Sequence, residues 1–237
     1  GKQFPNLIVA NINVAISSTL LPVMSRLQDD KEALKGAIRR FLRVGSYLLM
    51  PLMVGLAVVA EPLVRLLLTE KWLDCVPYLQ LFCVGFAFMP LQTANVQAVL
   101  AVGRSDVSLK TEIIKRGINI LVLILTFRIS VMAMVIGEVL CTATSLIVNT
   151  IVSKKLFNYG TLAQMWDVLP YILTSVAMGA AIWPISLLNL GDILTIVLQV
   201  VAGVIVYAIM SVAFRLDAFK YIWSKIKPIL SKVKSKN

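Results

Sequence analysis

The chain has 237 residues, of which 59% are hydrophobic and only 15% are charged, and its mean hydropathy is +0.86. Soluble domains are about half apolar and about a quarter charged, so this composition excludes an ordinary soluble domain and predicts a membrane protein. The formal charge of +11 does not indicate nucleic acid, because the basic residues lie between long apolar runs with few aromatic residues beside them. We therefore expect no nucleic-acid partner.

The residues that most enzymes and metal sites need are scarce. The sequence has no histidine, which removes the commonest general base, zinc ligand and pH switch. Cys75, Cys83 and Cys141 are widely spaced and show no metal-ligand pattern. No GxxxxGKS or GxxxxGKT loop is present, and no serine has a basic partner at a motif spacing. We expect no cofactor, no metal and no enzymatic activity.

Seven apolar stretches follow one another along the chain, and each is close to the roughly 20 residues that a bilayer-crossing helix needs. The sequence therefore predicts an all-α fold, a polytopic bundle of about seven membrane-spanning helices. The predicted spans are 4–24, 44–68, 77–102, 108–128, 130–152, 168–185 and 193–214.

The first span is the least apolar and concentrates its polar residues on one side. Asn6, Asn13 and Ser17 fall on one face at helical spacing, so we predict that this face lines protein or water rather than lipid. Two interpretations stay open: a hydrophilic path suited to sugar hydroxyls, and hydrogen bonds between helices.

The segment after the first span predicts a second kind of helix. Leu34, Ile38 and Phe41 form an apolar stripe opposite basic residues, and Asp29 or Asp30 can cap the start. This pattern is typical of an amphipathic helix that lies on the cytoplasmic surface of a membrane.

Prolines divide the next two spans. Pro51, Gly55 and Pro62 interrupt the second span, and Pro90 lies near the middle of the third, so kinked or broken helices are predicted. Gly103 is expected to end the third span.

Positive charge alternates between the connecting segments. The segments on one side hold 19 Lys and Arg residues and those on the other side hold 4, which are Lys2, Arg65, Lys71 and Arg128. Basic loops stay on the cytoplasmic side of a bilayer, so the amino end of this chain is expected outside and the carboxy end inside. The chain opens at Gly1 with no signal peptide, and we expect it to be the carboxy-terminal part of a longer protein.

Glu138 is the most informative single residue, since it interrupts an otherwise apolar span. Thr142, Ser145 and Asn149 share its helical face. A carboxylate inside a membrane span is a candidate for ion or proton coupling. The alternative is a glutamate near the outer end of its span that reaches the interface or caps a neighbouring helix.

Lys115 and Arg116 lie in the first turns of the fourth span and are the best candidates for anion binding. Lys and Arg bind phosphate through charge-assisted hydrogen bonds, so a phosphate group is the predicted ligand. Ordinary anchoring at the positive side of the membrane is the alternative. Gln92 and Asn95, just past Pro90, are predicted either to line a hydrophilic path or to make hydrogen bonds between helices.

Three segments in this order resemble a known family. They are "GKQFPNLIVANINVAISSTLLPVMSRLQDDKE", "PLMVGLAVVAEPLVRLLLTEKWLDCVPYLQLFCV" and "NVQAVLAVGRSD". The chain resembles the Wzx-type oligosaccharide flippases, polysaccharide transporters of the multidrug/oligosaccharidyl-lipid/polysaccharide exporter superfamily. Aligned so, it is similar to helices eight to fourteen of a fourteen-helix protein.

The resemblance implies a function and a domain plan. Residues 1–155 would complete the second transporter lobe, 156–215 would add two helices, and 216–237 would form a basic cytoplasmic tail. It implies flipping of undecaprenyl-diphosphate-linked oligosaccharide across the bacterial cytoplasmic membrane, for lipopolysaccharide or another surface polysaccharide. The implied partners are that lipid-linked substrate, membrane lipid and other polysaccharide-assembly proteins.

Two other functions stay open. A cation-coupled drug exporter of the same superfamily should line its cavity with more acidic and aromatic residues. A membrane glycosyltransferase or polymerase would bring a large loop with catalytic carboxylates or arginines, and no loop here is long enough.

Overall fold

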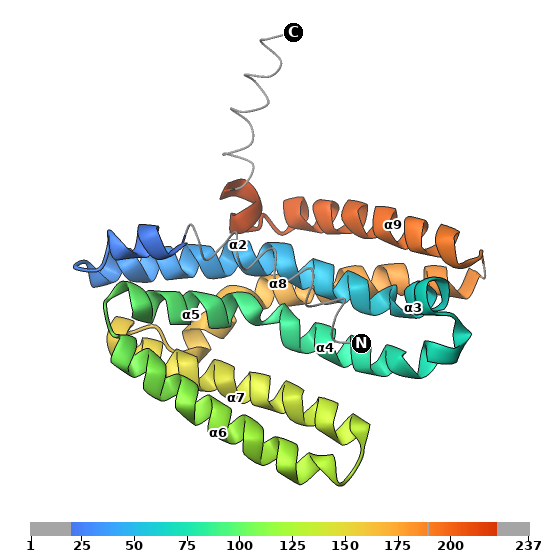
Figure 1. Ribbon diagram of the computed structural model, residues 1–237. Coiled ribbons are helices and arrows are strands. Elements are labelled where there is room, and N and C mark those ends of the chain that lie inside the picture. Colours follow the sequence, from blue (N-terminus) through green and yellow to red (C-terminus); the bar gives the residue numbers. More distant parts are fainter. Residues whose placement is uncertain (1–19, 189, 222–237) are drawn as a thin grey trace.

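The structure is a computed structural model that describes residues 20–188 and 190–221. Helices joined by short connections make up this part of the chain, no strand occurs in it, and Figure 1 shows the helices side by side in one bundle. The predicted all-α class is confirmed. The α-helices are α2 (Lys31–Val58), α3 (Ala60–Leu68), α4 (Val76–Ala87), α5 (Met89–Ala101), α6 (Ser105–Phe127), α7 (Val131–Phe157), α8 (Thr161–Ile182) and α9 (Asp192–Ala213). The described chain also holds two 3₁₀ turns, η1 (Glu70–Cys75) and η2 (Trp183–Leu188), and short helical stretches at residues 20–25 and 217–221.

Five helical stretches of the described chain are long and apolar enough to cross a membrane. They match the second, third, fifth, sixth and seventh predicted spans, and they are Lys31–Val58, Glu70–Ala101, Val131–Phe157, Thr161–Leu188 and Asp192–Ala213. The fourth predicted span is helix α6, which has 23 residues but carries several charges in its first half. Most of the first predicted span lies outside the described residues, so the total of seven stays a prediction.

Helix α2 is one continuous helix of 28 residues that joins the predicted surface helix to the second span. The predicted cap is confirmed at Asp30, whose carboxylate accepts hydrogen bonds from the backbone of Glu32 and Ala33. The predicted position on the membrane surface is wrong, because Leu34 and Ile38 are fully buried inside the bundle. An apolar stripe at helical spacing fits a lipid surface and a protein core equally well, and here the neighbouring helices cover it.

Breaks occur in both proline-containing spans, as predicted, but each lies beside the proline rather than at it. Pro51 sits inside α2 without ending it, and the helix stops at Val59 instead. Pro62 then falls in the first turn of α3, and Pro90 in the first turn of α5 after a break at Phe88. A first turn has no partner for a backbone N–H, so proline costs little there.

Glycines allow the closest helix contacts. A Cβ atom on Gly179 of α8 would lie 2.6 Å from Val54 of α2, and one on Gly137 of α7 would lie 2.8 Å from Val122 of α6. Figure 1 shows the α6–α7 pair on one side of the bundle and α9 on the opposite side. The space between the α6–α7 pair and helices α4 and α5 is where the candidate functional residues gather.

Two ion networks lie at opposite ends of the apolar segments of α2, α8 and α9. At one end Asp167 and Asp217 meet arginines of α2, and at the other end Arg65 lies 3.0 Å from Glu61 and 4.0 Å from Asp192. Between them the chain runs for 17 residues without a charge, 44–60, along α2 and into the first residue of α3. At 1.5 Å per residue this is about 25 Å, close to the roughly 30 Å hydrocarbon core of a bilayer. Charges placed only at the two ends are what a surrounding membrane requires.

Candidate functional site

Polar residues of α7 face helices α4, α5 and α6 along one line. Glu138, Thr142, Asn149 and Ser153 recur at intervals of four to seven residues, which keeps them on one helical face. We call this set the α7 polar face. Its two ends border two separate small cavities.

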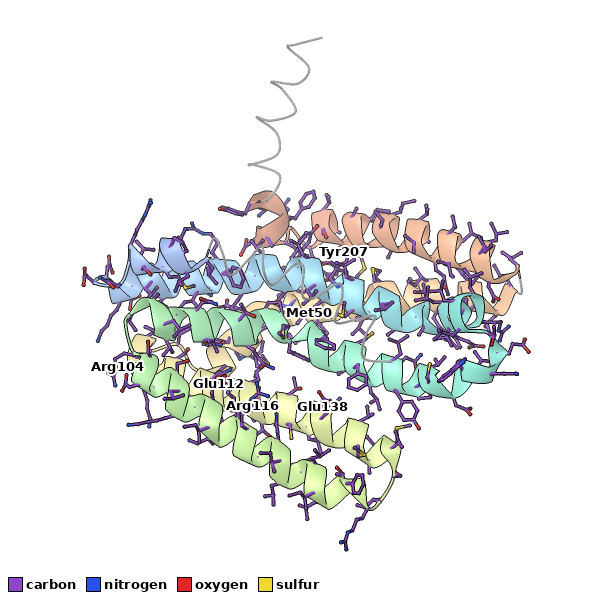
Figure 2. All side chains as sticks on the ribbon, in the orientation of Figure 1. Met50, Arg104, Glu112, Arg116, Glu138 and Tyr207 are labelled. Carbon is purple, nitrogen blue, oxygen red and sulfur yellow. The ribbon has the colours of Figure 1, made fainter. Side chains whose placement is uncertain are left out.

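Glu138 borders the cavity between α7 and the α4–α5 break. This cavity of about 200 Å³ is lined by Gln92 and Thr142 and by the rings of Phe82 and Phe86. Glu138 is exposed, and Figure 2 places it on the side of α7 that faces α4. The structure thus brings together two residues singled out in the sequence, Glu138 and Gln92, and adds two aromatic side chains that the sequence had not singled out.

Lys115 lies near the other end of the α7 polar face. Its side chain is 9% exposed, and its ammonium donates hydrogen bonds to the Glu112 carboxylate and, at 3.3 Å, to Asn149 Oδ1. Glu112 pairs with Lys115 three positions later, and not with Arg116 four positions later, although both spacings allow an ion pair on a helix. The lysine is thereby drawn into the bundle, and Arg116 is left exposed on α6.

Asn149 holds a hydrogen-bond donor that is not used. Lys115 donates to its Oδ1 atom, which fixes the amide orientation, and its Nδ2 atom is buried without a partner in the described chain. A buried donor left unpaired costs about 1–3 kcal/mol, so such groups call for an explanation. The adjoining cavity, bordered by Asn95, Thr111 and Glu112, has about 10 Å³ of free volume, room for about one water molecule.

Asn95 sits between three helices and is 1% exposed. Its amide and that of Gln164 on α8 form a reciprocal pair, with distances of 2.8 Å and 2.9 Å. Ser153 of the α7 polar face donates to the same Asn95 oxygen. These contacts are the hydrogen bonds between helices that the sequence left open as the alternative role of this residue. The remaining candidates, Asn6, Asn13 and Ser17, lie outside the described residues.

Within the described residues, one polar cluster is not indicated by the sequence. Asp167 of α8 accepts hydrogen bonds of 2.7 Å from Arg39, Arg43 and the hydroxyl of Tyr159, and Arg43 also bonds Asp217 at 2.6 Å. We call these five residues the Asp167 network. The sequence offered one signal, a lone carboxylate at the boundary of an otherwise basic, apolar segment.

The chain is similar in sequence to known proteins of polysaccharide biosynthesis. A family model described as "Polysaccharide biosynthesis protein" matches residues 1–77. Over 142 residues the chain is 31% identical to the lipopolysaccharide biosynthesis protein WzxC of Escherichia coli K12, which is 60% of this chain and 28% of WzxC. A membrane protein in the cps region of Klebsiella pneumoniae is also 31% identical, over 59% of this chain and 29% of its own length. The resemblance to Wzx-type polysaccharide transporters is confirmed.

Two further matches extend over most of the chain. The teichuronic acid biosynthesis protein TuaB of Bacillus subtilis is 20% identical over 89% of this chain and 44% of its own length. The fold is similar to that of the lipid II flippase MurJ in its inward closed conformation, with a TM-score of 0.71 and 16% identity over 90% of this chain. The chain spans less than half the length of each of these proteins, and 46% of MurJ. The helical bundle of this chain therefore has a fold similar to that of one part of MurJ.

Proposed function

We propose that this chain forms one lobe of a flippase that moves undecaprenyl-diphosphate-linked oligosaccharide across the bacterial cytoplasmic membrane. The product would feed the synthesis of lipopolysaccharide or another surface polysaccharide. The observation that carries the proposal is the agreement of a MurJ-like fold over 90% of the chain with 31% identity to WzxC. Transport requires no catalytic group, which fits a polar face built from amides, hydroxyls and single charges.

Lys115 is the residue we assign to the diphosphate of the substrate, with Arg116 next to it at the exposed side of α6. Lys115 already donates to Asn149, whose Nδ2 donor is unused, so a phosphate oxygen at this point would receive two donors. The cavity beside them holds only about one water molecule. A diphosphate can therefore reach Lys115 only when α6 moves away from α5, as alternating access requires.

Glu138 is the residue we assign to coupling. It borders a cavity of about 200 Å³ with Gln92, at the far end of the α7 polar face from Lys115. A cation or proton bound by this carboxylate would change the charge of the face that the substrate passes. The polar face of the first predicted span would supply further sugar contacts.

The test uses the host bacterium, in which the gene is deleted and then replaced by a gene for the unchanged protein or for a single-residue variant. Surface polysaccharide is measured by silver-stained gels or antiserum, and protein by immunoblot. Deletion should abolish the polysaccharide, and Lys115→Gln should reduce it at least tenfold at normal protein level. Lys110→Gln, one turn away and exposed, is the matched control and should leave it unchanged. Normal polysaccharide in the deletion strain would refute the proposed function, whereas a normal Lys115→Gln strain would remove only this residue from the site.

One observation favours a second function, a cation-coupled drug exporter. The cavity beside Glu138 is lined by the aromatic rings of Phe82 and Phe86, the combination expected for binding organic cations. Under this alternative, deletion would raise sensitivity to cationic dyes and leave surface polysaccharide intact. Growth in ethidium bromide, measured on the same strains, separates the two functions.

A further inference from the structure

A third cavity, with polar walls, lies on the opposite side of α2 from the α7 polar face. Its walls are the first turns of α2 and the helical turn at residues 217–221, and its volume is about 270 Å³. Arg39, Arg40 and Arg43 line it on the side of α2, and Asp217 and Tyr221 line it on the side of the later turn. None of these residues lines the cavity bordered by Asn95, Thr111 and Glu112, so this pocket is separate from the site assigned to transport.

The charges in this pocket do not cancel. Arg43 is bound by Asp167 and Asp217, and Arg39 donates its Nε and one terminal nitrogen to Asp167. Three guanidinium groups against these two carboxylates leave one positive charge. Arg40 carries it, because within the described chain it has no carboxylate partner and its guanidinium lies 5.6 Å from the centre of the Tyr221 ring. An aromatic ring attracts the guanidinium through its face and leaves the N–H groups of the guanidinium free to donate hydrogen bonds.

The backbone beside Arg40 is also open. Gly36 lies one turn before Arg40 on the same face of α2, and a Cβ atom added there would meet nothing within 4 Å. At Gly36, next to the Arg40 guanidinium, no side chain covers the helix backbone. This is room for a compact anion with several oxygen acceptors.

The level of the pocket along the bundle identifies the source of that anion. Arg43 is the last charge before the apolar run of α2, and Asp167 and Arg215 mark the same boundary for α8 and α9. Trp166, 67% exposed, flanks Asp167 at this boundary, as tryptophans do at membrane interfaces. Phosphate groups of lipids lie at this depth, and basic pockets between helices at this level suit anionic head groups.

We propose that the pocket formed by Gly36, Arg39, Arg40 and Tyr221 binds the phosphodiester head group of an anionic membrane phospholipid. The Arg40 fork and the free terminal nitrogen of Arg39 donate to the phosphate oxygens, and Asp167 and Asp217 hold the other guanidinium positions in place. The lipid joins α2 to the segment after α9. The inference depends on the membrane location and not on transport.

The experiment titrates the purified full chain, delipidated in detergent, with palmitoyl-oleoyl-phosphatidylglycerol and counts bound lipids by native mass spectrometry. Arg40→Gln should weaken the tightest binding event about fivefold, the effect of one basic residue near anionic lipid. Lys110→Gln, exposed on α6, should leave it unchanged. Equal losses in both variants would indicate unspecific attraction and overturn the proposal.

A second pair of variants tests the pocket without removing a contact. Gly36→Glu places a carboxylate in the open space and should weaken binding at least as much as Arg40→Gln, whereas the isosteric Gly36→Gln should retain most of it. Palmitoyl-oleoyl-phosphatidylcholine should bind several-fold more weakly than phosphatidylglycerol. Inorganic phosphate at 10 mM, as a rough upper level for a soluble competitor, should not displace the lipid. Displacement by phosphate, or equal binding of Gly36→Glu and Gly36→Gln, would overturn the assignment to a lipid head group.

Discussion

Asp167 receives four hydrogen bonds although its side chain is only 6% exposed. A carboxylate taken this far from water needs compensation, and two arginines and a tyrosine hydroxyl supply it. The arginines come from α2 and the carboxylate from α8, so the network joins the two helices at the membrane boundary. Arg39 is half exposed and keeps part of its hydration, which limits the net stabilisation.

Neutralising this carboxylate should destabilise the fold. Asp167→Asn leaves Arg43 and Tyr159 with a weaker acceptor, and we expect the free energy of unfolding to fall by about 2 kcal/mol. Unfolding by sodium dodecyl sulfate, followed by circular dichroism, measures it. The matched control is Asp106→Asn, because Asp106 also pairs with an arginine, Arg104, but at a site where both side chains are about half exposed. An equal effect of the two variants would contradict the structural role of Asp167.

Arg104 and Asp106 also give a pH expectation. The Arg104 guanidinium bonds Asp106 and lowers the pKa of that carboxyl below its ordinary value. A group with a lowered folded-state pKa stabilises the fold above its unfolded-state pKa, and this contribution is lost as the pH falls through the folded-state value. Since both side chains are solvated, the contribution at neutral pH is small, which is why Asp106→Asn serves as a control.

At the scale of the helices, the sequence predicted the apolar segments well and their partners poorly. Length and hydropathy predict five of the membrane-crossing stretches, and Pro62 and Pro90 indicate two helix breaks. The apolar stripe on the first turns of α2 predicts a helix on the membrane surface, because helical periodicity identifies an apolar face but not what covers it. Only the tertiary structure reveals that this face lies against other helices.

The candidate site has the same limit. Lys115 and Glu138 stood out as charges in apolar surroundings, which the sequence alone reveals. The buried Asn149 donor and the reciprocal pair of Asn95 and Gln164 depend on contacts between residues up to 69 positions apart, which no local pattern encodes. Asp167 does not stand out in the sequence for the same reason, since its arginines lie more than 120 positions earlier.

The close contact between α2 and α8 depends on a glycine, Gly179, which has no side chain. A methyl group on Gly179 would come within 2.6 Å of Val54, a short branched residue with little freedom to move aside. Gly179→Ala should therefore force α8 away from α2 and lower the free energy of unfolding by about 1–3 kcal/mol. Gly117→Ala is the control, because Gly117 is exposed on α6 with nothing within 4 Å of an added Cβ.

The control should behave in the opposite direction. Alanine has a higher helix propensity than glycine, so Gly117→Ala is expected to stabilise α6 by up to about 1 kcal/mol. Both variants are compared by the same detergent unfolding assay. A Gly179→Ala protein as stable as Gly117→Ala would mean that α2 and α8 do not approach as closely as the structure has them.

For the whole molecule, the positions of the two ion networks agree with the distribution of positive charge, since both place the membrane boundaries at the two ends of the bundle. The Asp167 network and the last turn of α7, which holds Lys154 and Lys155, lie at one end of the bundle. The pair of Arg65 and Asp192 lies at the other end, beside the loop that holds Lys71. The end with more positive charge should face the cytoplasm, since basic loops resist translocation.

Labelling of single cysteines tests this orientation directly. In a parent chain with alanine at positions 75, 83 and 141, Lys71→Cys and Asn158→Cys place one thiol in an exposed position at each end of the bundle. A membrane-impermeant maleimide should modify the cysteine at 71 in intact cells and the cysteine at 158 only after the inner membrane is opened. The reverse pattern would invert the predicted orientation and leave the crossing helices in place. Modification of both positions in intact cells would contradict the alternation itself, because α4 to α7 would then fail to return the chain to the side on which basic residues gather.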